Sequence, residues 1–287
     1  MHCRIRDLDV PYEAIGSGPP VVMLHGMGVD HRTLKGCMEP VLIDQPSAWR
    51  RIYFDLPGMG QTPGPAWIRN SDDVLGLVLS AMDEILGSES FALVGESYGG
   101  YLARGVVRAR PGQVLGVLLL CPLVVPRDRE RDVPPLTVLE REPGVGAADP
   151  EAQEFIDSFL TRQTSRTWPR FRDEMLCGYG VGDGDFQARV RADEAYALSS
   201  DPDTASVLYD GPSLILAGRQ DALVGYRDAW RLLDAFPRAS YAVLDMAGHG
   251  LQIEQPDLFR ALVLEWLARI RAHADESDAH SPHVGRR

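Results

Sequence analysis

The chain has 287 residues, of which 45% are hydrophobic and 24% are charged, so it suits one large globular domain or a core domain with an insertion. Acidic residues outnumber basic ones by 41 to 29, which gives a formal net charge of −12. Because this charge repels phosphate groups, we expect neither a nucleic-acid partner nor docking on anionic membranes.

The cysteines and the hydropathy of the sequence argue against metal-binding, disulfide-stabilised and membrane-spanning proteins. The four cysteines include no C-x-x-C pair, which argues against a zinc site and against a disulfide framework. No apolar run reaches the roughly 20 residues of a membrane span, and the first residues lack the pattern of a signal peptide. We therefore expect a cytoplasmic protein with no membrane partner and no bound metal, whose oligomeric state the sequence leaves open.

Short apolar runs alternate with amphipathic segments along most of the chain. The runs predict buried strands at 20–24, 51–55, 91–94, 114–121, 213–217 and 241–244, and residues 3–15 predict a hairpin at one sheet edge. Helical spacing of apolar residues marks 72–86, 98–109, 226–236 and 257–270. Ser71 is the expected N-cap of the first helix, and Gly87 is its expected end. The alternation predicts an α/β fold, with a mostly parallel central sheet and helices on both faces.

The alternation stops between residues 123 and 208. Prolines punctuate the first part of this segment, and helical stretches follow near 151–161, 168–176 and 186–198. We interpret it as a helical cap inserted into a core formed by residues 1–122 and 209–272; the alternative is a set of ordinary connecting helices. Residues 273–287 are polar without periodicity, and we expect a disordered tail there.

The strongest local pattern is Gly95-Glu96-Ser97-Tyr98-Gly99, placed where a predicted strand turns into a predicted helix. The glycines give room to a crowded turn, which raises the serine oxygen above the carboxyl edge of the sheet. The N–H groups of the helix start face negative charge that develops there. Ser97 is therefore the expected nucleophile.

A serine hydroxyl needs a base, and the base needs an acid that fixes its tautomer. His249 follows the last strand at the sheet edge where such folds bind ligands, and it is the expected base. Asp221 follows the preceding strand in Gly218-Arg-Gln-Asp221, and we favour it as the acid over Asp245 and Asp128.

Two backbone N–H groups complete the predicted site. His25-Gly-Met-Gly28 follows a strand, and its small residues let the loop fold over the serine. Met27 and Tyr98 are the expected donors of an oxyanion hole, through their amides.

These motifs together resemble the α/β-hydrolase superfamily over residues 1–272. They are His25-Gly-Met-Gly28, Asp55-Leu-Pro-Gly-Met-Gly-Gln-Thr62, the Ser97 turn, Gly218-Arg-Gln-Asp221 and Gly248-His249. The sequence is similar to the lid-bearing serine hydrolases of that superfamily, which include esterases, lactonases, peptidases and C–C bond hydrolases. The resemblance implies an inserted cap and no cofactor. Hydrolases of ring-cleavage products usually carry Asn before the nucleophile and Trp after the histidine, whereas this chain has Glu96 and Gly250.

We therefore expect a carboxylesterase-like enzyme (EC 3.1.1) that hydrolyses small carboxylic esters through an acyl-enzyme. A lactonase, a C–C bond hydrolase and an aminopeptidase remain alternatives, and a non-catalytic protein that binds a small ligand is the alternative from another class. An aminopeptidase would place cap carboxylates such as Glu151, Glu154 and Asp157 near the substrate ammonium. The candidates for substrate contact are His25, Glu96, Trp168 and Phe171, where Glu96 either binds a polar substrate group or hydrogen-bonds nearby backbone.

Overall fold

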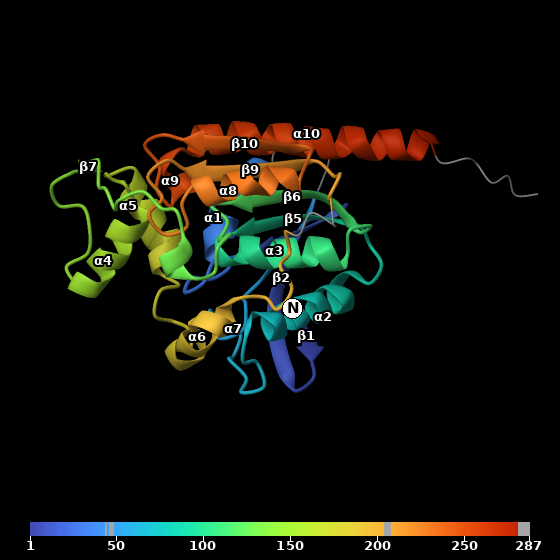
Figure 1. Cartoon of the computed structure of the whole chain (residues 1–287), viewed down its shortest axis with the longest axis horizontal. Coiled ribbons are helices and arrows are strands. Elements are labelled where there is room, and N and C mark those ends of the chain that lie inside the picture. The colour runs from blue at the N-terminus through green and yellow to red at the C-terminus, as the bar shows by residue number, and fades with distance from the viewer. Residues whose placement is uncertain (44, 46–48, 204–207, 281–287) are drawn as a thin grey trace, which may run out of the picture.

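The computed structural model describes residues 1–43, 45, 49–203 and 208–280, and its centre is an eight-stranded sheet (Figure 1). The strands run in the order β1-β2-β4-β3-β5-β6-β9-β10. Their bounds are β1 His2–Ile5, β2 Leu8–Ile15, β3 Pro20–Leu24, β4 Arg50–Phe54, β5 Phe91–Glu96, β6 Val114–Leu120, β9 Ser213–Gly218 and β10 Ala239–Leu244. β1 and β2 form an antiparallel hairpin, β2 pairs antiparallel with β4, and all pairs from β4 to β10 are parallel. The predicted mostly parallel sheet is confirmed.

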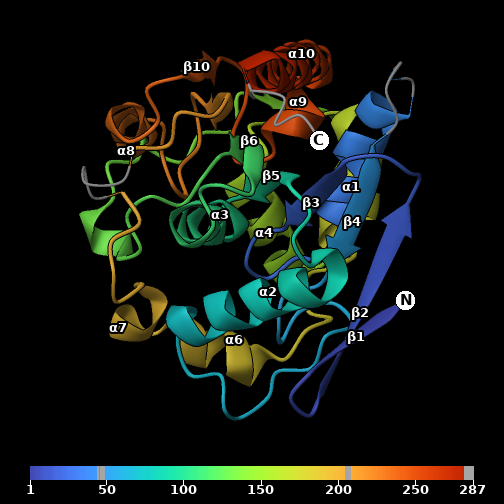
Figure 2. The same cartoon turned by 90° about the vertical axis from the view of Figure 1, so that its right-hand side faces the viewer.

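Helices cover both faces of this sheet, as Figure 2 shows. α1 and α10 pack on each other on one face, and α2 and α3 pack on each other on the opposite face. The helices outside the insertion are α1 Arg32–Leu42, α2 Ser71–Leu86, α3 Tyr98–Ala109, α8 Arg227–Trp230, the 3-10 turn Arg231–Asp234, α9 Leu251–Glu254 and α10 Pro256–His280. Within the described residues, no helix combines the length and apolar character needed to cross a bilayer.

The core lies between the sheet and these helices. Every residue of β3 and β5 is buried, because the two central strands are covered on both faces. Trp266 of α10 is completely buried, and its indole N–H donates to the carbonyl of Pro212 at 3.1 Å. Truncation of such a side chain costs about 3–5 kcal/mol. The core therefore holds the strand ends in fixed positions.

The insertion between β6 and β9 has its own small apolar cluster. Its elements are the 3-10 turn Asp128–Glu130, β7 Glu140–Arg141, α4 Pro150–Phe159, β8 Arg162–Gln163, α5 Thr167–Phe171, the π-turn Arg172–Leu176, α6 Gly184–Arg191 and α7 Asp193–Tyr196. Ile156, Phe159, Leu160, Phe171 and Met175 pack together with Val29 and Ile253 of the core. Figure 1 shows α4 and α5 beyond the ends toward which the parallel strands point. The extent of this cap as a domain and its role as a lid stay predictions.

Two helix ends differ from the sequence prediction. Asn70, not Ser71, caps α2, because its side chain accepts from the amide of Asp73 at 2.9 Å. The Ser71 hydroxyl is buried and donates to the carbonyl of Tyr196 at 2.8 Å. α10 runs on to His280, beyond the predicted helix end at residue 270. The expected disorder of the tail stays a prediction. Residues 281–287 of the predicted tail lie outside the described residues.

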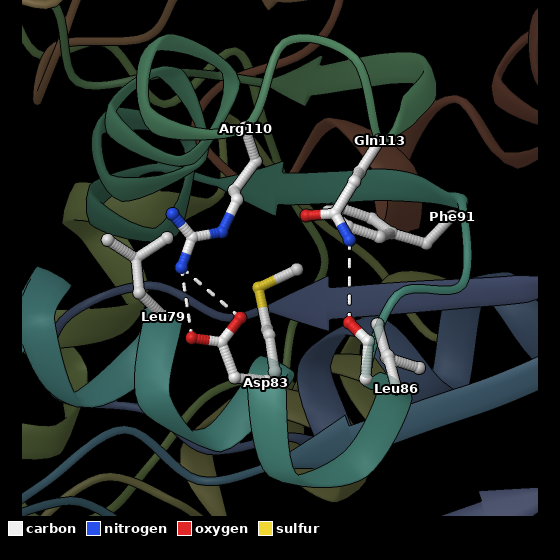
Figure 3. A pocket seen from close by; sticks show the side chains of 8 residues that line it. Leu79, Asp83, Leu86, Phe91, Arg110 and Gln113 are labelled. Carbon is white, nitrogen blue, oxygen red and sulfur yellow. Dashed lines mark hydrogen bonds and ion pairs between the residues drawn. The ribbon is translucent and has the colours of Figure 1, made fainter.

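A small cavity lies at the amino end of β5, between α2 and the end of α3 (Figure 3). Its volume is about 10 Å³, which is room for one water molecule. The ion pair between Arg110 and Asp83, 2.9 Å long, borders it. This cavity is too small for a substrate and lies at the opposite end of β5 from Ser97.

Candidate active site

Ser97, Asp221 and His249 all follow the carboxyl ends of parallel strands. Ser97 comes directly after β5, Asp221 lies in the turn after β9, and His249 lies in the loop after β10. β5, β6, β9 and β10 are consecutive parallel neighbours, so these ends share one edge of the sheet. In open α/β sheets this edge is where ligands bind.

The backbone at Ser97 adopts a conformation that side chains rarely take, with φ 52° and ψ −117°. Its amide donates to the carbonyl of Leu120 at 3.0 Å, and its carbonyl accepts from the amide of Leu123 at 2.9 Å. A Cβ on Gly95 would lie 2.5 Å from the carbonyl oxygen of Gly99, and one on Gly99 would lie 2.0 Å from that of Leu24. Both glycines are therefore required, and the strain of about 1–3 kcal/mol is held by the surrounding strands.

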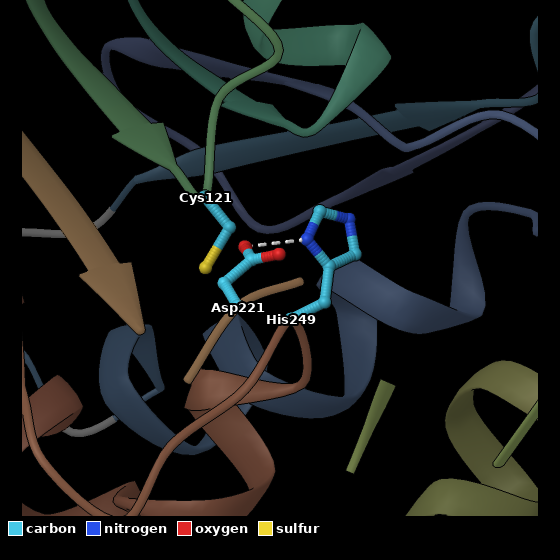
Figure 4. A group of neighbouring side chains, drawn as sticks. All are labelled: Cys121, Asp221 and His249. Atoms are coloured by element: carbon cyan, nitrogen blue, oxygen red, sulfur yellow. Dashed lines mark hydrogen bonds and ion pairs between the residues drawn. The ribbon is translucent and has the colours of Figure 1, made fainter. Parts of the chain in front are cut away.

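His249 and Asp221 form a buried hydrogen-bonded pair. The imidazole Nδ1 lies 2.8 Å from Asp221 Oδ2, and the side chains are 2% and 0% exposed (Figure 4). The other carboxylate oxygen of Asp221 accepts from the amides of Leu223 at 2.9 Å and Val224 at 3.1 Å. Asp221 is thus held on both oxygens, and His249 Nε2 remains for a second partner.

The pKa of Asp221 is lowered and the pKa of His249 is raised, and both changes favour an ion pair between the two side chains. Burial alone raises the pKa of Asp221, but His249 and the two backbone amides lower it more, so the net pKa is below 3.8. Burial alone lowers the pKa of His249, but the charge and hydrogen bond of Asp221 raise it more, so the net pKa is above 6.5. The imidazole is therefore a stronger base than a free histidine.

The two rejected aspartates lie elsewhere. Asp245 accepts from the side chain of Gln220 at 2.8 Å on the exposed side of the loop. Asp128 is itself exposed and forms an ion pair of 2.6 Å with Arg131. Of the three aspartates weighed from the sequence, Asp221 is the one that contacts His249.

Ser97 and His249 line one cavity of about 610 Å³. The core contributes Met27, Leu223 and Val224 to its wall, and the insertion contributes Leu123, Arg131, Glu151, Glu154, Phe155, Ser158, Phe159, Tyr179, Gln187, Arg191 and Tyr196 among others. A volume of this size suits a small organic molecule.

The predicted oxyanion donors belong to the residue after Ser97 and to the loop after β3. Tyr98 opens the 12-residue helix α3, so its amide has no acceptor within the helix. The Tyr98 side chain is fully buried, with its hydroxyl 2.9 Å from the Ser71 hydroxyl, so only its backbone is available to a ligand. Met27 lines the cavity in the loop after β3. A Cβ on Gly26 would lie 3.2 Å from Ser97 Cβ, which shows how closely this loop approaches the serine.

His25 does not line the cavity but fixes this loop. Its Nε2 accepts from the amide of Leu56 at 2.9 Å, so Nδ1 carries the proton and donates to the carbonyl of Gly26 at 2.7 Å. Burial lowers the pKa of His25, more than Asp55 raises it, so the ring stays neutral. The expectation of a substrate contact from His25 is corrected, because both ring nitrogens already hold the backbone.

Glu96 is also not among the residues that line the cavity. Its side chain is 1% exposed, and Oε1 accepts from the side-chain amide of Gln252 at 3.2 Å. Burial raises the pKa of Glu96 to about 7. Of the two roles left open by the sequence, internal hydrogen bonding is the one that the geometry supports.

Trp168 and Phe171 are not among the residues that line the cavity. They pack inside the insertion, where the Phe171 ring lies 5.8 Å from the Phe155 ring and 6.0 Å from the Phe159 ring. The cavity wall therefore does not include the two aromatic residues that the sequence suggested, because an amphipathic pattern does not distinguish a face toward a core from a face toward a cavity. Phe155 and Tyr179, which do line it, carry the same apolar signal.

Among the described residues, two groups of side chains have the composition of metal sites. Cys121, Asp221 and His249 bring one ligating atom each within 4.8 Å, as do Asp30, His31 and Asp55. Burial raises the pKa of the Cys121 thiol well above its usual range, so it is a neutral group beside Asp221. Nδ1 of His31 is 2.8 Å from Asp55 Oδ1. Each group thus contains one hydrogen-bonded His–Asp pair, and the carboxylate of Asp30 accepts from the side chain of Arg32. These contacts favour hydrogen-bonded roles over metal binding.

Comparison with known proteins identifies the family. The model of the alpha/beta hydrolase family matches residues 21–262. The chain belongs to the alpha/beta hydrolase family. The chain is 27% identical to 2-hydroxy-6-oxononadienedioate/2-hydroxy-6-oxononatrienedioate hydrolase 2 from Pseudomonas putida, over 91% of this chain and 92% of the relative. It is 25% identical to the pimeloyl-acyl-carrier-protein methyl ester esterase of Aeromonas salmonicida, over 89% of this chain and 98% of the relative.

A solved structure agrees with this assignment. The alpha/beta superfamily hydrolase from Oenococcus oeni PSU-1 superposes with a TM-score of 0.85 at 27% identity, over 94% of this chain and 99% of that one. The predicted superfamily, the fold and the assignment as a hydrolase are thereby confirmed. The bond that is cleaved differs among the relatives, so the finer activity rests on the site.

Proposed function

We propose that this hydrolase cleaves small carboxylic esters through an acyl-enzyme on Ser97, with His249 as general base and Asp221 as the acid that orients it. One observation carries the proposal. A serine on a strained strand-to-helix turn and a buried His249–Asp221 pair, 2.8 Å long, open onto the same cavity. A neutral imidazole with a raised pKa is the base that a serine hydroxyl requires.

In the proposed reaction, His249 Nε2 takes the hydroxyl proton while Ser97 Oγ attacks the ester carbonyl carbon. The negative charge that develops on the carbonyl oxygen is stabilised by the amides of Met27 and Tyr98. The tetrahedral intermediate then expels the alcohol, which receives its proton from His249. Water, activated by the same imidazole, hydrolyses the acyl-enzyme and restores Ser97. Asp221 stays ionised throughout and stabilises the imidazolium that forms twice per cycle.

A second candidate activity is C–C bond hydrolysis. It is favoured by the relative named 2-hydroxy-6-oxononadienedioate/2-hydroxy-6-oxononatrienedioate hydrolase 2, whose match covers 91% of this chain. Glu96 and Gly250 stand where hydrolases of ring-cleavage products usually carry Asn and Trp, and this difference favours the ester reaction.

Aminopeptidase activity has a weaker basis in the cavity wall. Glu151 and Glu154 line the cavity, as an ammonium-binding site would need. Asp157, the third carboxylate considered, instead forms an ion pair of 2.6 Å with Arg141. Exposed carboxylates on a helix are usually solvated, so the ester reaction remains our proposal.

A hydrolysis panel tests the proposal. We expect the purified protein to cleave nitrophenyl acetate and butyrate faster than a lactone, an aminoacyl anilide or a vinylogous diketone. Turnover of the diketone above that of the esters would replace the proposal with the second candidate. Failure of every substrate, together with no labelling by a fluorophosphonate probe, would indicate a binding protein.

A further inference from the structure

The carboxylate of Glu254 connects two parts of the molecule. One is the loop that contains His249, and the other is the insertion. Glu254 is the last residue of α9 and is 3% exposed. Its Oε2 accepts from the amide of Gly248 at 2.6 Å, and its Oε1 accepts from the amide of Arg162 at 2.7 Å. Gly248 directly precedes His249, and Arg162 begins β8 of the insertion. One buried side chain therefore bridges backbone groups of both regions.

Phe159 makes further contacts across the same junction. The amide of Gly250 donates to the carbonyl of Phe159 at 3.0 Å. The Phe159 ring meets the His249 ring edge-on, with centroids 5.0 Å apart. Residues on both sides of His249 are thus tied to 159–162 of the insertion.

The other side of this loop is closed by the sheet. A Cβ on Gly218 would lie 2.1 Å from the carbonyl oxygen of Gly248, and a Cβ on Gly248 would lie 2.6 Å from that of Phe159. The loop is therefore held between the end of β9 and residues 159–162, with little room to move. A shift of the insertion at this point would displace the imidazole.

We propose that Glu254 is a positioning residue, whose bridge from Gly248 to Arg162 holds His249 in place by fixing the loop to the insertion. Both bonds have an N–H donor, so the residue must accept on both oxygens. A carboxylate does so, whereas a glutamine offers one acceptor and turns its own N–H₂ toward a donor. The consequence for catalysis rests on the proposed role of His249 as base.

The matched variants are Glu254→Gln and Glu140→Gln. Glu140 lies on the neighbouring strand β7, where it accepts from the side chain of Arg162 at 2.9 Å and takes no part in the bridge. We expect Glu254→Gln to lower kcat for nitrophenyl acetate by about 10- to 100-fold with KM within about twofold, because a small misplacement of a catalytic group has this effect. Glu140→Gln should stay within about twofold of the wild type in both constants.

A spectroscopic readout separates positioning from loss of the fold. The proton of the His249–Asp221 hydrogen bond should give a low-field resonance in the wild type and in Glu140→Gln, and it should weaken or shift in Glu254→Gln. This measurement needs no substrate, so it tests the bridge even if esters prove not to be the substrates. A folded Glu254→Gln protein with wild-type kcat and an unchanged resonance would refute the proposal and leave the function intact.

A second pair of variants tests the bridge at its donor, the backbone N–H of residue 162. Arg162→Pro deletes the N–H donor and keeps Glu254, whereas Arg162→Ala keeps the donor. If Glu254→Gln fails to fold, we expect folded Arg162→Pro to have a kcat several times lower than Arg162→Ala. Equal values in this pair would contradict the proposed bridge.

Discussion

The carboxyl edge of the sheet and the insertion form opposite walls of one cavity, but their sequences encode them differently. On the sheet side, Ser97, Asp221 and His249 each follow a buried strand, and backbone geometry fixes them. On the insertion side, the wall comes from side chains scattered over residues 123–196. From this difference we predict that the chemistry resides in the core and that the insertion sets the choice of substrate.

Breaking the aspartate contact should give the largest effect on the core side. Asp221→Asn should lower kcat by about 10⁴-fold, because an amide fixes the wrong imidazole tautomer. Asp245→Asn should stay within about threefold, since Asp245 contacts Gln220 on the exposed side of the loop. Steady-state kinetics on nitrophenyl acetate decides between them, and the reverse order would mean that Asp245 is the functional acid.

Removal of one oxyanion donor should have the next largest effect. Met27→Pro deletes the backbone N–H and should lower kcat by about 10²–10³-fold, whereas Met27→Ala keeps it and should retain most of the turnover. Circular dichroism and thermal melts must first show that both proteins are folded. Equal kcat values in the folded pair would exclude the Met27 amide from the transition state.

The pH dependence of activity tests whether Asp221 raises the pKa of His249. His249 must be neutral to act as base, so activity is lost as pH falls through its pKa. Because Asp221 raises that pKa, the acidic limb of kcat/KM should have its midpoint above pH 6.5. In Asp221→Asn the residual activity should have a midpoint at lower pH, since burial alone lowers the pKa of a histidine. An unshifted limb would assign the titration to another group.

Substitutions in the insertion should change substrate ranking more than chemistry. Phe155→Ala and Gln187→Ala alter the cavity wall and should change the ratio of butyrate to acetate turnover by about 3- to 10-fold. Phe171→Ala is the matched control, because this buried residue lies outside the cavity wall. It should lower stability by about 3–5 kcal/mol and leave the ratio unchanged. The same ratio in all three variants would argue against a role of the insertion in specificity.

The predicted catalytic residues of the core could be found from the sequence, because the backbone conformations around them require particular residues at nearby positions. Gly95 and Gly99 flank Ser97 since no Cβ fits at either place, and that spacing is visible in the sequence. Asp221 and His249 were placed by following strand ends. Nothing local singles out Glu254, because its partners lie six residues back and in another region of the chain.

The insertion was less predictable because its apolar residues serve two surfaces. Phe155 packs in the cluster of the insertion and also lines the cavity, while Phe171 only packs. Both residues belong to helical segments with a similar spacing of apolar residues. Only the tertiary arrangement of α4 over the sheet edge determines which of the two reaches the cavity. Side-chain direction at a tertiary contact is not set by periodicity.

The most direct test of the account is the site of covalent labelling by a fluorophosphonate. Mass spectrometry of the digested wild type should place one adduct on Ser97, and Ser97→Ala should show no adduct and at least about 10³-fold less esterase activity. Ser158→Ala is the control, because Ser158 lines the same cavity but donates its hydroxyl to the carbonyl of Phe155 at 2.8 Å. Labelling and activity of that variant should equal those of the wild type. Full esterase activity in folded Ser97→Ala, or an adduct on a different serine, would contradict the assignment of Ser97 as nucleophile.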